Sequence, residues 1–284
     1  MQATLLNGLT GVLADTLAQG FVLVGAIVAL AAAHGFVERA SRAILTRSFG
    51  WWSVLWTGWI GVPIHEMSHL VMAKVFRHRV SDLSLFSPDP RTGMLGYVNH
   101  TWKPESRYQR AGNFFIGVAP VIGGAAALVL LTRLILPPGS ILDDSSRILA
   151  AFLTSPDTST GLSLARHLAL ELPASLFTPP MLSSWRLWLV LYLVMAVGLH
   201  MSPSREDLKG TWKGFVYIAG GLLCLNVIAL PFGGIPDSYL GAAAYLVAPA
   251  AAALLIALAL NLVALALVSL AAWTVSSLKA SPAR

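Results

Sequence analysis

The feature that most constrains this chain is a group of three ionisable side chains in the middle of an apolar segment. Residues 58–76 read GWIGVPIHEMSHLVMAKVF, with His65, Glu66 and His69 at the centre. Each ionisable group at membrane depth costs about 2 to 3 kcal/mol, so three groups in one helix require a partner that neutralises them. A bound metal ion is such a partner, and a pathway for protons or ions is the alternative.

The composition indicates an integral membrane protein. Of the 284 residues, 56% are hydrophobic and only 11% are charged, which is more apolar material than one soluble core buries. A helix needs about 20 apolar residues to cross the hydrocarbon of a bilayer. We therefore expect an all-α membrane protein with six transmembrane helices, near residues 13–33, 51–75, 111–136, 184–202, 211–231 and 243–273.

The expected spans divide the chain into three regions. Residues 1–50 hold an N-terminal span and its connecting loop, residues 51–215 the core with the ionisable groups, and residues 216–284 the C-terminal spans. Within the core, residues 137–183 are expected to form an external loop, of which 161–172 would lie on the membrane surface. Cys224 is the single cysteine, so an internal disulfide is excluded.

The distribution of Lys and Arg predicts the orientation and the partners. Most of the 19 basic residues fall in cytoplasmic segments if both termini are cytoplasmic, and the ionisable groups then lie near the cytoplasmic side. Basic residues between spans set topology and contact anionic lipid, so the lipid bilayer is an expected partner and nucleic acid is not. The Ala- and Leu-rich composition suggests a bacterial inner membrane, and the sequence gives no indication of the oligomeric state.

The spacing of the histidines suits a catalytic zinc ion. With about 3.6 residues per helical turn, His65 and His69 project from one face and reach one ion, while Glu66 stands beside them to take a proton from an attacking water. Zinc needs a third protein ligand. We expect it in GLHMSPSREDLKG, residues 198–210, where Asp207 is the first candidate and Glu206 and His200 are its rivals.

A β-hairpin is expected over residues 80–100, around the turn SPDPRTG. Membrane helices must be unwound before cleavage, so an exposed strand edge would hold a substrate by strand addition, although a plain connecting hairpin is the alternative. The hairpin would bring His100 near the ionisable groups. Otherwise the histidines near span ends or in loops are expected to be solvated: His34, His78, His100 and His167.

The third expected span carries residues that would bend it or contact a substrate. Pro120 and Gly123 weaken the helix and would admit water to the metal, although glycines in membrane helices also serve close packing. Asn113 would hydrogen-bond a substrate backbone, or else cap the helix at the interface.

These motifs together resemble the site-2 protease family of intramembrane zinc metalloproteases. The family pattern is an H-E-x-x-H span, a hairpin, a span with a G-P-x-x-N element and a later aspartate motif. In this chain MLGYVNH at 94–100 resembles the family's hairpin strand, and AGNFFIGVAPVIGG at 111–124 resembles the start of its next span. HMSPSREDLKG at 200–210 resembles the aspartate motif. The resemblance covers roughly residues 50–215 and implies a core-only member without a PDZ domain.

The resemblance implies roles for four residues. His65, His69 and Asp207 would hold one zinc ion, and Glu66 would be the general base. The substrate would be a transmembrane protein, cleaved in or near its membrane segment.

The chain departs from the family pattern at three positions. His200 stands where the family has asparagine three residues before the proline, and Asp207 follows Pro203 one residue sooner than usual. Gly123 occupies the position of the usual asparagine in the third span.

Three functions remain to be distinguished by experiment. The first is a membrane-embedded zinc endopeptidase of the type that acts in regulated intramembrane proteolysis. The second is a non-hydrolytic metal-binding membrane protein, either a carrier or a degenerate protease relative that binds membrane partners. The third is a zinc peptidase that uses Glu206 as its carboxylate ligand.

Overall fold

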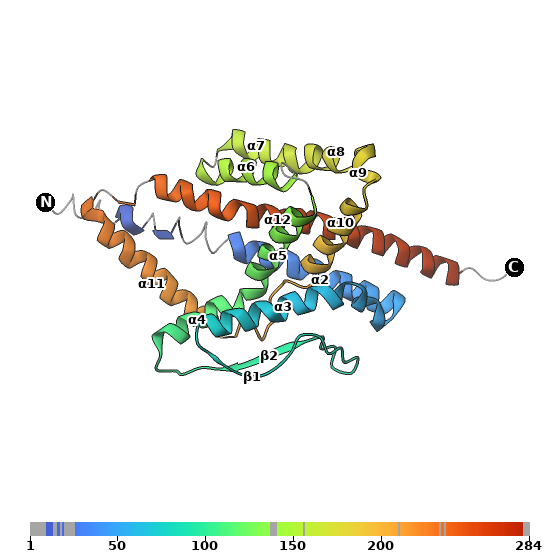
Figure 1. Cartoon of the computed structure of the whole chain (residues 1–284), viewed down its shortest axis with the longest axis horizontal. Coiled ribbons are helices and arrows are strands. Elements are labelled where there is room, and N and C mark those ends of the chain that lie inside the picture. The colour runs from blue at the N-terminus through green and yellow to red at the C-terminus, as the bar shows by residue number, and fades with distance from the viewer. Residues whose placement is uncertain are drawn as a thin grey trace.

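The computed structural model describes residues 10–13, 16–17, 19, 26–136, 141–155, 157–209, 211–232, 234–235 and 237–280. Within these ranges the regular structure is helical apart from one hairpin (Figure 1). The elements follow in the order α2 (Ala26–Phe49), η2 (Trp51–Val54), α3 (Leu55–Val75), β1 (Arg79–Ser84), β2 (Tyr97–Thr101), α4 (Arg107–Gly117), α5 (Ala119–Ile135), α6 (Ile141–Thr154), α7 (Thr158–Arg166), the π-helix η3 (His167–Glu171), α8 (Leu172–Leu176), α9 (Pro179–Leu182), α10 (Trp185–Gly198), α11 (Thr211–Ala229), η4 (Leu230–Phe232) and α12 (Asp237–Ala280).

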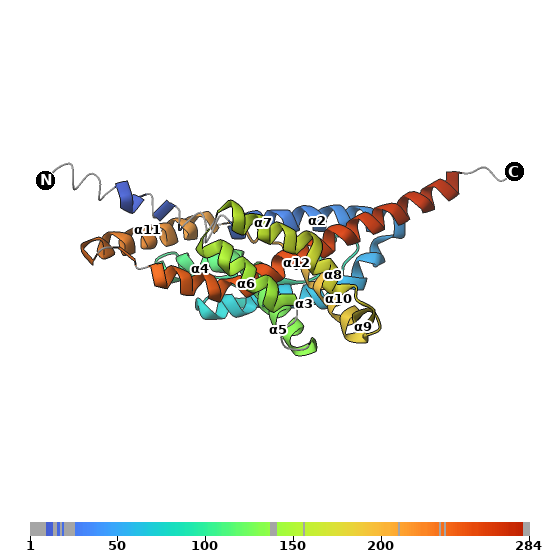
Figure 2. The same cartoon turned by 90° about the horizontal axis from the view of Figure 1, so that it is seen from above.

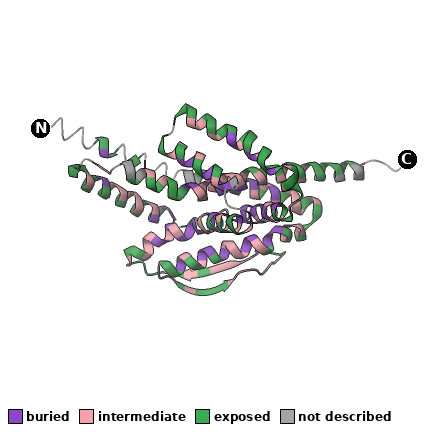
Figure 3. Cartoon of the chain, turned by 45° about the horizontal axis from the view of Figure 1, so that its top comes forward, coloured by how far each residue is buried: buried purple, intermediate pink, exposed green. Residues whose placement is uncertain are grey.

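The centre of the molecule is formed by α3, α5, α10 and the middle of α12: α5 and α10 pack on each other and on both α3 and α12. Apolar side chains of these helices, such as Leu128, Val197 and Ala257, are almost completely buried. Figure 3 shows that buried residues gather in these central helices, whereas the peripheral helices are largely exposed. The core therefore fixes the helix α3, which carries the ionisable groups.

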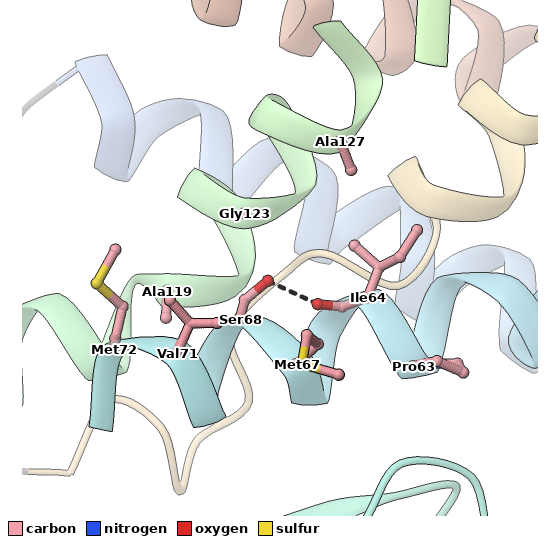
Figure 4. Close-up of a pocket in the computed structure, with 9 residues that line it drawn as sticks. All are labelled: Pro63, Ile64, Met67, Ser68, Val71, Met72, Ala119, Gly123 and Ala127. Carbon is pink, nitrogen blue, oxygen red and sulfur yellow. Dashed lines mark hydrogen bonds between the residues drawn. The ribbon is translucent and has the colours of Figure 1, made fainter. Parts of the chain in front are cut away.

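Close helix packing depends on glycines in two places. A Cβ atom at Gly198 of α10 would lie 2.3 Å from the Asn261 side chain of α12. A Cβ atom at Gly123 of α5 would lie 1.9 Å from the Ser68 hydroxyl of α3. In Figure 4, Gly123 accordingly faces Ser68, whose hydroxyl donates a hydrogen bond of 2.6 Å to the Ile64 carbonyl.

The hairpin expected over residues 80–100 is present, and its strands β1 and β2 pair antiparallel below α3 (Figure 1). Asp89 closes the turn by accepting hydrogen bonds from Arg91 and Thr92, and Gly93 adopts the left-handed φ of 74°. The register shifts between Val80 and Asp82, which leaves an extra residue in β1.

The prediction of six transmembrane helices is wrong. Among the described residues two helices are long and apolar enough to cross a membrane, Lys213–Phe232 and Gly241–Thr274, or up to three if a bent pair counts as one span. The second of them is part of α12, which runs along most of the molecule in both Figure 1 and Figure 2. These two helices indicate that the protein associates with a membrane.

The other expected spans fail for separate physical reasons. The third is broken by a bend of 58° between α4 and α5, where Pro120 lies in the first turn of the new helix. The fourth, α10, has only 14 residues and rises about 21 Å, which is short of the hydrocarbon thickness. The second, α3, has the polar groups of His65, Glu66 and His69 at its centre.

The first expected span does not coincide with a helix of the structure. Part of it, residues 14–15, 18 and 20–25, lies outside the described residues. The helix α2 begins inside it but continues to Phe49 and carries Glu38, Arg39 and Arg42, which are unsuited to hydrocarbon. The expected external loop is also largely helical, since α6, α7, η3, α8 and α9 occupy its described residues.

Candidate metal centre

Two imidazoles of α3 face each other across one turn of the helix. The Nε2 atoms of His65 and His69 are 3.2 Å apart. The Nδ1 atom of His65 lies 2.7 Å from the His200 carbonyl, and that of His69 lies 3.0 Å from the Ile116 carbonyl. A carbonyl only accepts hydrogen bonds, so both Nδ1 atoms carry hydrogen in the neutral imidazoles and both Nε2 atoms present lone pairs to the same point. Metal-binding histidines characteristically have this arrangement.

Asp207 completes the group from the loop between α10 and α11. Its carboxylate oxygens lie 3.2 Å from His69 Nε2 and 3.7 Å from His65 Nε2. One ligand atom from each of the three residues falls within 4.8 Å of the others. The backbone N–H of Ser204 donates to the Asp207 carboxylate over 2.6 Å, so the loop itself orients the carboxylate.

The charge on Asp207 is favoured by this setting. Burial alone would raise the pKa of its carboxyl, but hydrogen bonds from His65 and His69 and their charge hold that pKa well below its usual range when the two imidazoles are protonated and no metal is bound. Two imidazole nitrogens and one carboxylate leave a coordination position open. Such a donor set suits catalytic Zn²⁺, and it is also the set that holds non-haem Fe²⁺.

The other two candidates for the third ligand lie elsewhere. The His200 ring is buried, and its Nε2 is 3.0 Å from the Thr57 hydroxyl, so only its carbonyl reaches the centre. Burial, together with the charges of Arg42 and His65, lowers the pKa of His200 to about 3. The exposed Glu206 side chain pairs with Lys209 instead. The geometry therefore favours Asp207 over both.

Glu66 lies on the wall of the cavity beside the two imidazoles. Its side chain packs against Gly96 of the hairpin, where an added Cβ would be 2.9 Å from Glu66 Cγ. The carboxylate makes no hydrogen bond with any residue that the structure describes, so it is available to a water molecule. The hairpin thus sets the position of the group suited to act as a base.

The centre opens into a cavity of about 900 Å³ between α2, α3, the hairpin, the end of α4 and the loop after α10. Asn113 and His100 line this cavity, and their expected contact with a substrate stays a prediction. Pro120 is buried at the start of α5 and does not line it. Gly123 lines a separate apolar groove of about 450 Å³ between α3 and α5 (Figure 4).

Sequence reasoning missed a polar contact at the cavity wall. Glu38 of α2 accepts a hydrogen bond of 2.8 Å from Ser202 and forms an ion pair of 3.2 Å with Arg42. This contact ties α2 to the loop that carries Asp207. The sequence holds no local signal for it, because residues 38 and 202 are distant along the chain.

The expectation that three further histidines are solvated is wrong, since His34, His78 and His167 are all buried. His167 bonds with Ser145 over 2.9 Å and with Glu171 over 3.1 Å, which resembles a serine hydrolase triad. Ser145, however, is only 2% exposed, so its hydroxyl is closed to a substrate. We interpret this cluster as a link between α6 and η3.

No protein-family model matches this chain, and neither a curated protein nor a solved structure matches it.

Proposed function

We propose that the protein is a membrane-associated zinc endopeptidase that hydrolyses peptide bonds in or near transmembrane segments of other proteins. One observation carries the proposal: ligand atoms of His65, His69 and Asp207 converge on one point, and Glu66, whose carboxylate bonds with none of the described residues, lines the same cavity. This is the residue set that metal-assisted hydrolysis of a carbonyl requires.

The roles of the residues follow from their positions. His65, His69 and Asp207 would hold the zinc ion, which when bound supplies a Lewis acid and lowers the pKa of a water molecule toward about 7. Glu66 would take the proton of the attacking water and deliver it to the nitrogen of the leaving amine. The carbonyls of His200 and Ile116 would keep the two imidazoles in the tautomer that the zinc requires.

The proposed substrate class is supported by the surroundings of the centre. The two long apolar helices indicate a membrane, and β2 forms one wall of the cavity. An unwound membrane segment has free backbone N–H and C=O groups, which the edge of β2 would satisfy by strand addition. A position near the cytoplasmic face of a bacterial inner membrane, with both termini cytoplasmic, is supported by charge and composition alone.

The test is the substitution Glu66→Gln, made in the full chain and compared with Glu206→Gln as a matched control. Both proteins would be reconstituted in lipid vesicles with a single-span reporter, and bound metal would be measured by elemental analysis. We expect about one zinc per chain in both variants, with cleavage lost only in Glu66→Gln, because the base contributes at least about a hundredfold.

Three results would refute the proposal. Cleavage by Glu66→Gln at the native rate would exclude Glu66 as the base. Bound zinc in a native protein that cleaves no membrane reporter would favour a non-hydrolytic metal-binding protein, while bound iron would indicate redox chemistry at the same ligands.

A further inference from the structure

A second pair of histidines lies at the hairpin, outside the candidate metal ligands. The Nδ1 atoms of His78 and His100 are 3.0 Å apart, and His78 is only 4% exposed. His78 lies between α3 and β1, and His100 lies in β2 opposite Val80. The register of the hairpin shifts next to this point, between Val80 and Asp82, and such bulges change the direction of neighbouring side chains.

The hydrogen bonds of this pair fix the tautomer of both rings. The Nε2 atom of His78 is 2.9 Å from the Gln109 carbonyl, so in the neutral ring Nε2 carries the hydrogen and Nδ1 is an acceptor. The Nδ1 atom of His100 must then carry a hydrogen and donate it to His78. The Nε2 atom of His100 is therefore left with a lone pair.

Hydrogen bonds of Gln109 hold the hairpin around the pair. The Gln109 side chain donates to the Arg77 carbonyl over 2.7 Å and accepts from the Lys103 N–H over 2.6 Å. These bonds tie both ends of the hairpin to α4. Burial lowers the pKa of both imidazoles, and His78 lowers that of His100 further, which supports a neutral pair at pH 7.

His100 is a residue of the cavity wall. His100 lines the same cavity as His65, Glu66, His69 and Asp207, and its Nε2 forms no hydrogen bond with the described residues. An Nε2 lone pair accepts hydrogen bonds, so it cannot donate one to a substrate carbonyl. Within an unwound peptide, the group that it fits is a backbone N–H.

We infer that His100 is a substrate-binding residue whose unprotonated Nε2 accepts a hydrogen bond from a backbone N–H of the peptide, and that His78 is the positioning residue that holds this tautomer. The inference rests on the proposed function for the identity of the ligand. The assignment of the His100 tautomer does not rest on the proposed function, because it follows from the hydrogen bonds of the hairpin.

The test combines two measurements on the full chain. The first is nitrogen NMR of the labelled imidazoles in native protein, with signals assigned through His100→Phe. We expect the hydrogen of His100 on Nδ1 and its loss from that atom in His78→Phe. The second is the kinetics of reporter cleavage, with bound zinc measured in every variant.

In the kinetics, we expect His100→Phe to keep about one zinc per chain and kcat, and to raise KM about tenfold, the value of one hydrogen bond. His78→Phe should raise KM similarly, and the double variant should add little, since the two residues act as one unit.

An Nε2–H tautomer for His100 in the native protein, or an unchanged KM in His100→Phe, would overturn the inference. Loss of zinc in His100→Phe would also overturn it, because the residue would then support the metal site. Failure of the proposed function is distinguishable: it would be seen in a native protein that cleaves nothing, whatever the tautomer of His100.

Discussion

Replacing Gly61 by alanine should weaken metal binding, although Gly61 touches no metal ligand side chain. Gly61 lies on the face of α3 that contacts α10, and a Cβ atom there would be 2.3 Å from the Ala196 carbonyl oxygen. Ordinary contact begins at 3.4 Å, so α3 and α10 must separate locally by about 1 Å. The His200 carbonyl, which orients His65, follows α10 directly and would move with it.

The expected loss of zinc affinity follows from the usual cost of overpacking and the usual cost of losing a group that orients a metal ligand. Overpacking of this kind costs about 1 to 3 kcal/mol, of which the better helix propensity of alanine recovers about 1 kcal/mol. Loss of the group that orients a metal-binding histidine costs about 10-fold to 100-fold in metal affinity. We therefore expect at least about a tenfold loss of zinc affinity in Gly61→Ala.

The measurement is competition for zinc with a fluorescent chelator in detergent solution, and Gly58→Ala is the matched control. At Gly58, one turn earlier in α3, an added Cβ meets His200 and Phe86 at 3.7 Å, which is ordinary contact. The control should keep its zinc affinity within about twofold. Equal affinities in the two variants would refute the reasoning that the α3–α10 contact holds His65 in place.

Three other predictions concern the base, the metal and the periphery. Gly96→Ala should keep zinc but lower kcat about tenfold, because the added methyl group displaces Glu66; an unchanged kcat in the cleavage assay would contradict this. Asp207→Asn should release most of the zinc in elemental analysis, and the native protein should lose thermal stability with a chelator and regain it with zinc. Asn226→Leu should lower stability by about 1 kcal/mol in thermal unfolding, since the buried Asn226 amide bonds with Gln19 over 2.8 Å.

The sequence was a good guide to the centre because its chemistry is mostly local. His65 and His69 face one ion through the periodicity of α3 alone, and Asp207 was selected because it follows α10. The carbonyls of Ile116 and His200 could not be predicted, since every residue has a carbonyl and only the tertiary fold selects these.

The sequence was a poor guide to the membrane spans because hydropathy measures composition and not helix continuity. Apolar residues continue across Val118, yet the chain bends there by 58° between α4 and α5. The same limit explains the buried His78. Its position in a loop suggested solvent, but α4 closes over it through the Gln109 carbonyl.

The length of α12 has a consequence for the bilayer around the protein. Its apolar stretch, Gly241–Thr274, has 34 residues and rises about 51 Å, against about 30 Å of hydrocarbon. If this helix crosses a bilayer, it must tilt by about 54° to match that thickness, beyond the usual range, or the lipid beside it must thicken. Because the middle of α12, around Ala252 and Ala257, is packed into the core, this hydrophobic mismatch would act on the whole molecule if α12 crosses a bilayer. Bilayer thickness would therefore set how the cavity below α3 is inclined toward a neighbouring membrane helix.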